Sequence, residues 1–503
     1  MTSFLHEFKK TIKRRAKSES NLRRNQLQLF DRTKIYAKVS KDIENINDYV
    51  AVFSKSLPHD ANGIVDKSQI ELLLKAIKKG NRKYVDQMTL GSTKMKLANL
   101  MAFMSTELSD MNISSFKIRS SPEFSSAEFA GDMVELYEME LCRDVNFNDF
   151  DTTSAVIDAT TDLNQLSDFR GPKPVTTKNF FRGNTVGDLT GPYVSQFLLM
   201  PFMYGVCRMV QEYNFPPAGS DYLQTETAYL SCQNGTVTQT SVPMDIAKRY
   251  INTPRDLAEY VHNDTMCQAY YNAHMILQGL KVPTNPGSPY GTTIKNESPF
   301  VTMGPPDIQD LIHKAGRLAL HASWLQKVSF MRIRPEVYAY EVDRAMSKNK
   351  NYGVHNDVLQ SNILPKIFSK YGNYLLSSCY PEGSPTHPSF PAGHACIAGA
   401  SVTILKAFYD GSFILPQSYV ANGSSLNTIP DQLTVNNELD KLASNIAFGR
   451  NIAGVHYRSD GEEGLKLGEE VAINVLMNHV KRYNEKVALQ ITKRDGSKIV
   501  IKN

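Results

Sequence analysis

The stretch from His387 to Ala395 holds the residue types and spacing best suited to chemistry. Pro391 disfavours a helix at the residue before it, and a run of small and apolar residues follows Gly393, so we expect a buried helix to begin there. The free N–H groups and the dipole of a helix N-terminus attract oxyanions, and a glycine lets an anion approach the backbone closely. His394 can hold or pass a proton at the same place. The alternative is a tight turn before a core helix, with an incidental histidine.

Two cations form a second candidate group. Lys327 and Arg334 lie seven positions apart in a segment with helical periodicity. Since seven positions are close to two helical turns, the sequence predicts that both share one face with Leu320 and Trp324. Cations on an otherwise apolar face need an anion nearby. That anion is either a ligand or an aspartate or glutamate from a neighbouring helix.

A third group contains Arg450, His456 and Asp460. Arg450 and His456 are six positions apart, which is not one helical face, but Gly454 offers a break that lets the histidine turn back toward the arginine. Asp460 is close enough to accept a hydrogen bond from the second ring nitrogen of His456 and fix its tautomer. The alternatives are a satisfied core histidine and an aspartate that caps a helix.

Together the three groups are more specific than any one of them. Their patterns along the chain are Lys-x6-Arg-Pro, Pro-x-Gly-His and Gly-Arg-x5-His-x3-Asp. They provide three cations, a backbone N–H and two histidines. Such a set would form a cage for a tetrahedral or trigonal-bipyramidal oxyanion, with one histidine in line to bond its central atom.

This set of motifs resembles that of the vanadium-dependent haloperoxidases, whose superfamily includes the type 2 phosphatidic acid phosphatases. Segments outside the three groups are similar to the algal and bacterial bromoperoxidase branch: Leu57–Asp60, Glu135–Tyr137, Gly191–Phe197 and Asp256–His262. The resemblance covers most of residues 50–480 and weakens at both ends. It implies vanadate as the cofactor, and a structural calcium ion is a second candidate.

By this resemblance, the expected vanadate-binding residues are Lys327, Arg334, Gly393, His394, Arg450 and His456, with Ala392 at the usual serine position. The three cations would neutralise vanadate oxygens, Gly393 would donate its N–H, and His456 would be the ligand of the metal. His394 would hydrogen-bond the opposite axial oxygen and manage protons, and Lys327 would polarise the bound peroxide. The expected catalytic residues are therefore His394, Lys327 and His456. Beside them the resemblance places halide or supporting residues: His387, Trp324 and Asp460.

The activity implied is oxidation of a halide by hydrogen peroxide to hypohalous acid, which halogenates a small organic acceptor. In this chemistry vanadium acts as a Lewis acid at constant oxidation state. His387 matches the bromoperoxidase pattern, where chloroperoxidases tend to carry an aromatic residue. Bromide and iodide are therefore the expected halides, and chloride stays open.

One departure from the family concerns the usual Pro-Ser-Gly-His, which here is Pro391-Ala392-Gly393-His394. The serine hydroxyl that would bond an equatorial oxygen is absent, while the charged cage is intact. Two alternatives stay open: a soluble acid phosphatase that uses the same cage with His456 as nucleophile, and a non-catalytic oxyanion-binding homologue. The bromoperoxidase-like segments outside the cage argue against the first, and the alanine is the support for the second.

The composition is that of a large globular protein. The chain has 503 residues, 41% of them hydrophobic, which is ample for a large core. A net charge of +5 is too mild to indicate a nucleic-acid partner. We expect no membrane span, since the apolar runs are short, and no signal peptide, since the basic N-terminus lacks an apolar core. The six cysteines form no CxxC pair, which favours reduced thiols in a cytoplasmic protein.

The elements that must position these residues are predicted to be mainly helical. The expected helices are Ala127–Leu141, Tyr193–Val210, Pro254–Leu280, Asp307–Arg334, the run after Gly393, Leu439–Arg450, and Gly461–Tyr483 with Ser459 and Asp460 as caps. Residues 283–305 are expected to be a long loop, 410–436 are expected to be a surface excursion with glycine and Asn-Gly turns, and Asp495-Gly496 marks a hairpin within Leu489–Lys502. The fold class is mainly α, with a haloperoxidase-like core of two four-helix bundles implied by the resemblance, long loops and a small C-terminal β-hairpin.

Three regions are expected along the chain. Residues 1–120 form a helical extension that serves in oligomerisation, 121–485 form the helical core with the oxyanion site, and 486–503 form the hairpin. The first part of the extension, residues 1–30, is polar and basic. The resemblance implies a homo-oligomer, between a dimer and a dodecamer.

Overall fold

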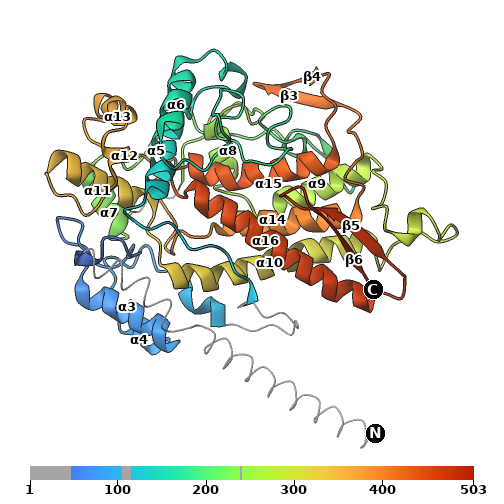
Figure 1. Ribbon diagram of the computed structural model, residues 1–503, viewed down its shortest axis with the longest axis horizontal. Coiled ribbons are helices and arrows are strands. Elements are labelled where there is room, and N and C mark those ends of the chain that lie inside the picture. Colours follow the sequence, from blue (N-terminus) through green and yellow to red (C-terminus); the bar gives the residue numbers. More distant parts are fainter. Residues whose placement is uncertain (1–46, 105–114, 238–240) are drawn as a thin grey trace, which may run out of the picture.

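The structure, a computed structural model, describes residues 47–104, 115–237 and 241–503 and is mainly helical (Figure 1). The α-helices of these residues are α3 (Lys67–Lys79), α4 (Lys83–Asp86), α5 (Ala127–Cys142), α6 (Ser154–Gln165), α7 (Glu226–Gln233), α8 (Pro254–Tyr260), α9 (Gln268–Gly279), α10 (Pro305–Phe330), α11 (Pro335–Ser347), α12 (Asn356–Leu359), α13 (Ile363–Tyr371), α14 (Gly393–Phe408), α15 (Val435–Ile452) and α16 (Arg458–His479). Short 3-10 helices are η1 (Asn47–Tyr49), η2 (Leu100–Met104), η4 (Phe147–Asp149), η5 (Gln196–Leu198), η6 (Pro289–Gly291) and η7 (Val480–Arg482). The predicted mainly α fold class is confirmed.

The strands within the described residues form separate two-stranded antiparallel sheets. They are β1 (Phe202–Tyr204) with β2 (Cys207–Met209), β3 (Ser418–Asn422) with β4 (Ser425–Ile429), and β5 (Ala488–Thr492) with β6 (Lys498–Lys502). In the C-terminal pair Ala488 lies opposite Lys502, and the turn contains Gly496 at a φ of +82°, which favours glycine. The hairpin predicted around this turn is confirmed.

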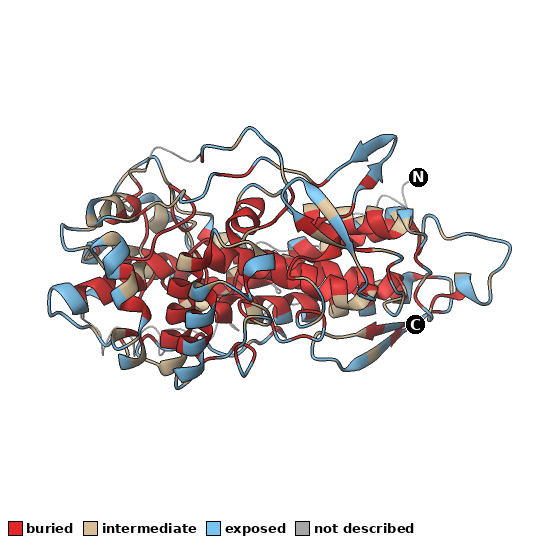
Figure 2. Ribbon diagram, turned by 90° about the horizontal axis from the view of Figure 1, so that it is seen from above, coloured by how far each residue is buried: buried red, intermediate tan, exposed pale blue. Residues whose placement is uncertain are grey.

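Helices α10, α14, α15 and α16 form the central bundle, and α14 contacts the other three. Figure 2 shows a continuous body of buried helices through the middle of the molecule. Within the bundle, α14 is buried along nearly its whole length. Glycines let α14 and α16 approach closely: a Cβ on Gly399 would lie 2.1 Å from the Leu465 carbonyl oxygen, and one on Gly468 would lie 2.1 Å from that of Cys396. Close backbone packing therefore fixes α14, whose first residue is Gly393.

A second group of helices surrounds α5, which contacts α6, α11, α12 and α13. The predicted helix at α5 is confirmed, and its buried acids reach the first turn of α16. Glu135 Oε1 accepts a hydrogen bond of 2.5 Å from Arg458, and Asp132 accepts one from the Ser459 hydroxyl. These contacts hold the start of α16 in place, close to His456 and Asp460.

Two helix predictions in the middle of the chain are wrong. Tyr193–Val210 contains η5 and the β1–β2 hairpin, because Pro201 cannot continue a helix and Gly205, at a φ of +62°, makes the turn. The helix predicted over Pro254–Leu280 is divided into α8 and α9 by a loop that ends at Cys267, whose φ is +71°. No glycine or proline in that loop signalled the break.

Two further helix boundaries differ from the prediction. α10 ends at Phe330 because Met331 takes a left-handed φ of +48°, and α11 begins at Pro335, so Arg334 lies outside α10. α16 begins at Arg458 rather than at Gly461. Its expected caps therefore lie inside the first turn, where the Asp460 carboxylate accepts a 3.2 Å hydrogen bond from the Tyr457 N–H.

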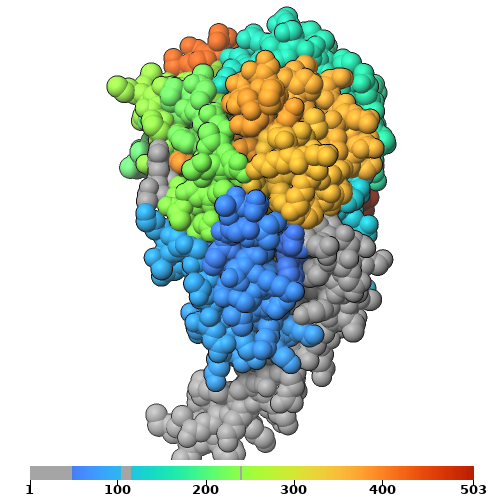
Figure 3. Space-filling view, turned by 90° about the vertical axis from the view of Figure 1, so that its left-hand side faces the viewer, coloured from blue at the N-terminus to red at the C-terminus, as the bar shows by residue number. Residues whose placement is uncertain are grey.

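Residues 47–104 lie against one side of the remaining chain, drawn in blue below the green and orange segments in Figure 3. The Phe53 N–H donates to the Met331 carbonyl at 2.8 Å, and the Trp324 indole N–H donates to the Asn99 carbonyl at 2.7 Å. This segment therefore supports α10 and the turn that follows it. The polar helix predicted over residues 1–30 lies outside the described residues, and the division into three regions stays a prediction.

In the part of the chain that the structure describes, no helix combines the length and apolar character needed to cross a membrane. All six cysteines are free thiols, and five of them are buried. This agrees with the expectation that the cysteines form no disulfide framework.

Candidate active site

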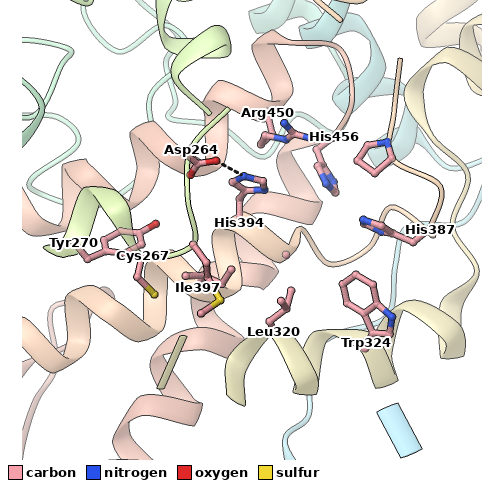
Figure 4. A pocket seen from close by; sticks show the side chains of 13 residues that line it. Asp264, Cys267, Tyr270, Leu320, Trp324, His387, His394, Ile397, Arg450 and His456 are labelled. Atoms are coloured by element: carbon pink, nitrogen blue, oxygen red, sulfur yellow. Dashed lines mark hydrogen bonds and ion pairs between the residues drawn. The ribbon is translucent and has the colours of Figure 1, made fainter. Parts of the chain in front are cut away.

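A cavity of about 280 Å³ lies beside the N-terminus of α14, between α10, the end of α15 and the loop after α8 (Figure 4). Its lining consists of Asp264, Met266, Cys267, Tyr270, Leu320, Trp324, Pro385, His387, Gly393, His394, Ile397, Arg450 and His456. The structure thus brings members of all three sequence groups to one place. Lys327, Arg334 and Asp460 are not part of the lining, and their side chains are fully buried.

The N-terminus of α14 forms one wall of this cavity. Ala392 is the N-cap, in an extended conformation, and Gly393 is the first helical residue. The first N–H groups of a helix lack intrahelical acceptors, and a Cβ on Gly393 would come within 3.1 Å of Leu320, so glycine keeps this wall open. The imidazole of His394 is held by Asp264, with Nε2 lying 3.0 Å from the carboxylate oxygen Oδ1 (Figure 4).

Lys327 occupies the last turn of α10 and is fully buried. Its Nζ donates to the carbonyl oxygens of Pro388 at 2.9 Å, Ser389 at 2.8 Å and Pro391 at 2.5 Å. Three carbonyl groups satisfy the three donors of an ammonium group without neutralising its charge. Burial, and then the positive charge of Arg334, lowers the pKa of Lys327 well below its usual value.

Arg334 lies in the link between α10 and α11 and is fully buried. Its guanidinium donates to the carbonyl oxygens of Val455 at 2.7 Å and His387 at 3.0 Å. It also reaches two ring nitrogens, His456 Nε2 at 3.0 Å and His387 Nδ1 at 3.1 Å. Burial lowers the pKa of Arg334 to about 10.

Arg450, near the end of α15, donates from Nη1 to the Val261 carbonyl at 2.9 Å and to the Tyr380 hydroxyl at 3.3 Å. Its guanidinium also lies 5.1 Å from the centre of the Tyr380 ring. The Nε of Arg450 is buried and has no hydrogen-bond partner among the described residues. Because an unpaired buried N–H is costly, this atom is suited to an anion bound in the cavity.

Arg450 lines the cavity, and Lys327 and Arg334 are buried behind its lining residues Trp324, His387 and His456; we call the three the cavity cations. Within residues 47–104, 115–237 and 241–503, none of them forms an ion pair with an acidic side chain. Other buried arginines do have carboxylate partners: Arg332 with Asp460, Arg143 with Asp221, and Arg458 with Glu135. The cavity cations therefore do not pair with a described aspartate or glutamate, which was the alternative raised from the sequence.

Lys327 and Arg334 come together for a reason other than the predicted one. They were expected to share one helical face, but α10 ends between them and the chain turns at Met331. The extended segment before α14 holds both, since Lys327 donates to the carbonyl of Pro388 and Arg334 donates to that of His387. The prediction of one shared helical face is wrong.

His456 is buried, with Nδ1 lying 2.8 Å from Asp460 Oδ2 and Nε2 facing the Arg334 guanidinium. These partners assign the ring proton to Nδ1 and a lone pair to Nε2. Burial, and then the charge of Arg334, lowers the pKa of His456 well below its usual value, so the ring is neutral. Burial raises the pKa of Asp460, but Arg332 and His456 outweigh it and bring that pKa well below its usual value.

Arg332 supports this histidine–aspartate pair. Its Nη1 donates to Asp460 Oδ1 at 2.6 Å and to the Ser459 hydroxyl at 2.7 Å, and its Nη2 donates to Asp132 at 3.1 Å. Two aromatic rings flank the guanidinium, with centres 4.0 and 4.4 Å away. Arg332 therefore joins α5 and α16 around the carboxylate that orients His456.

Sequence reasoning missed both Asp264 and Arg332. Asp264 lies in the loop that was predicted to be helix, and no spacing links it to His394. Arg332 did carry a signal, since a cation two positions before Arg334 in an apolar segment requires a partner of its own.

His387 and Trp324 form an aromatic wall of the cavity, with ring centres 4.8 Å apart. Burial, and then the charges of Lys327 and Arg334, lowers the pKa of His387 well below its usual value. This wall therefore carries no charge at neutral pH.

No group of three or more histidine, cysteine, aspartate or glutamate side chains is arranged to hold a metal ion in the described part of the chain. The candidate calcium ion stays a prediction from the sequence.

Known proteins are similar in sequence to this chain, both in the helices around the cavity and over most of its length. The model of the VCPO second helical-bundle domain matches residues 311–486. The vanadium-dependent bromoperoxidase of Corallina officinalis is 30% identical over an alignment of 544 positions, gaps included, which covers 90% of this chain and 91% of the relative. That of Ascophyllum nodosum is 30% identical over an alignment of 469 positions, which covers 87% of this chain and 84% of the relative.

A solved structure shows the same fold. The homohexameric second vanadate-dependent bromoperoxidase of Ascophyllum nodosum superposes with a TM-score of 0.87 at 24% identity, covering 97% of this chain and 90% of that one. The arrangement of helices described above is therefore shared over almost the whole chain.

The tautomer of His456 is the first testable prediction. We expect nitrogen-15 NMR of histidine-labelled protein to show a neutral ring with its proton on Nδ1, staying neutral below the usual histidine pKa of about 6.5. Because the folded state resists this protonation, the contribution of His456 to stability falls as the pH drops below about 6.5. The signal is assigned by its loss in His456→Gln, and an imidazolium or an Nε2–H ring at neutral pH would contradict the assignment.

Proposed function

The chain belongs to the vanadium-dependent haloperoxidase family, in the branch of the bromoperoxidases, and on this premise we propose that it oxidises bromide and iodide with hydrogen peroxide. The product is hypohalous acid, which halogenates a small organic acceptor. The cofactor is vanadate, which when bound supplies Lewis-acid activation of peroxide without changing oxidation state.

The observation that carries this proposal is the unbalanced charge of the cavity. The cavity cations have hydrogen-bond acceptors but no described acidic partner. An anion bound among them would remove the cost of burying unpaired charge. Vanadate suits the donors present, because its oxygens can accept from the unpaired Nε of Arg450 and from the N–H groups at the start of α14.

We assign vanadate binding to the cavity cations, Gly393, His394 and His456. The cations neutralise the oxygens, and Gly393 donates its backbone N–H. His456 is the metal ligand through Nε2, since Asp460 holds the ring proton on Nδ1. In the structure Arg334 donates a hydrogen bond to Nε2 of His456. That hydrogen bond would have to break before Nε2 could bind vanadium.

His394 and Asp264 are the proposed proton-handling pair. Asp264 engages Nε2 of the imidazole, which leaves Nδ1 to exchange protons in the cavity. At that atom His394 would accept and donate the protons that the reaction exchanges in the cavity.

The halide is proposed to bind near the aromatic wall of His387 and Trp324. Both side chains are uncharged, and the positive charges of Lys327 and Arg334 lie beside His387. An anion is therefore attracted to this side without meeting a competing negative charge.

The function is tested by vanadate-dependent bromination of monochlorodimedone with bromide and peroxide, in wild type and two histidine variants. Wild type should brominate only after orthovanadate is added. His456→Ala removes the metal ligand and should lose vanadium on gel filtration. His394→Ala should keep vanadium but lose roughly 10²–10⁴ in rate, the usual effect of a proton-transfer residue.

Each alternative gives a different result in this test. Hydrolysis of phosphate esters without halide oxidation would identify an acid phosphatase. Vanadate binding without either activity would identify an oxyanion-binding homologue. Equal loss of vanadium in the two variants would contradict the separate roles of His394 and His456.

Ala392 gives a second prediction. It is fully buried at the N-cap of α14, where the family usually has serine. In Ala392→Ser the hydroxyl can donate to a vanadate oxygen, and a hydrogen bond to a charged group is worth about 1.5–3 kcal/mol, or roughly one to two decades in affinity. We expect a smaller gain, because water can satisfy the same oxygen in wild type.

Calorimetric titration with orthovanadate measures this affinity, and thermal unfolding provides the control. If the hydroxyl instead caps the helix by accepting the Ala395 N–H, stability rises by about 0.5–2 kcal/mol and the affinity does not change. Unchanged or weaker affinity in a folded variant would contradict the prediction and show that the site is adapted to alanine.

We also propose a cytoplasmic homo-oligomer. The support for assembly is the homohexamer formed by the bromoperoxidase of the same fold, and the support for location is the set of free cysteines. Light scattering should give a mass several times the 56.4 kDa of the chain, and a monomer mass would contradict the proposal. Recovery in a membrane or secreted fraction would contradict the location.

A further inference from the structure

Met266 lies at the rim of the cavity, and we propose that it is the methionine that the hypohalous acid formed by this protein oxidises first. The inference rests on the proposed function, because the oxidant is the product of that reaction.

The position of Met266 follows from the exposure of the cavity lining. Among the 13 residues that line it, Met266 has the largest exposed fraction, 41%. At the other extreme, Arg450 is 5% exposed and His456 is 2% exposed. Met266, two positions after Asp264, is thus the most exposed side chain of the lining, and we expect product formed beside Arg450 and His456 to meet it on the way to solvent.

Two other oxidisable side chains line the cavity near Met266, but both are protected. Cys267 and Tyr270 lie side by side in Figure 4. Cys267 is 2% exposed and Tyr270 is 3% exposed. Burial raises the pKa of Cys267 to about 11, so the reactive thiolate is scarce at neutral pH. The thioether of methionine needs no deprotonation to react, which leaves Met266 as the accessible nucleophile of this wall.

The reaction needs no further reagent. The sulfur of Met266 attacks the halogen of hypohalous acid, so that an S–halogen bond forms and the O–halogen bond breaks with release of hydroxide. Water then bonds to sulfur as the S–halogen bond breaks and halide leaves, and of the two protons that this water loses one neutralises the hydroxide. One thioether and one hypohalous acid thus yield one sulfoxide, one halide ion and one proton. The sulfur is oxidised by two electrons and the halogen is reduced by two, and the new S=O group places a polar oxygen at the cavity rim.

The experiment compares oxidant made in the cavity with oxidant added to the solution. In the first arm, vanadate-loaded protein receives peroxide and bromide without an organic acceptor. In the second arm, the same protein receives reagent hypobromite in the same total amount. Peptide mass spectrometry measures sulfoxide at Met266 and at two controls of similar exposure, Met346 at 40% on α11 and Met477 at 49% on α16.

We expect the oxidation of Met266 relative to the controls to be at least about tenfold higher in the first arm, because product released in the cavity meets it at a high effective concentration. Equal ratios in the two arms would overturn the proposal. So would the same sulfoxide yield from peroxide without bromide. Bromide oxidation is followed in parallel, and its absence would overturn the proposed function and with it the source of the oxidant.

Discussion

Burial of the positive charges of Lys327, Arg334 and Arg450 is the constraint on which the rest of the site depends. Taking an ion out of water costs several kcal/mol unless hydrogen bonds or an opposite charge compensate. Here the hydrogen bonds are present, but no described acidic side chain forms an ion pair with any of the three, and burial lowers the pKa of both Lys327 and Arg334. An oxyanion bound among them would supply an opposite charge, and its binding would also stabilise the folded state. Site and core are therefore energetically coupled.

Asp460 is the residue through which this charged region joins the helical bundle. Its side chain accepts from His456 and from Arg332, while its backbone carbonyl accepts from the Ala392 N–H at 2.9 Å. The first turn of α16, the N-cap of α14 and the ring of His456 are thus parts of one hydrogen-bonded unit. Close packing of α14 on α16 at Gly399 and Gly468 gives that unit a rigid base.

The sequence was informative where local signals decide the structure. The start of α14 follows from Pro391 and the small residues after Gly393, and the C-terminal hairpin follows from its Asp-Gly turn. Tertiary contacts decided the rest. The break between α8 and α9, which carries Asp264, contains no glycine or proline, and the left-handed turn at Met331 uses a residue that rarely adopts it. Lys327 and Arg334 were expected to lie close together because they share one helix. They lie close together because both donate hydrogen bonds to the segment before α14.

The extended segment before α14 explains why many residues of the site lie outside regular helices. A helix has already used most of its carbonyl groups, whereas an extended chain can turn several toward one donor. Lys327 is held by three such carbonyls between Pro388 and Pro391, and Arg334 is held by two more, at His387 and Val455. Carbonyl dipoles orient the cations without cancelling their charge, which carboxylates in the same places would do. The irregular segments around the bundle thus fix the donors in position and leave their positive charge available to an oxyanion.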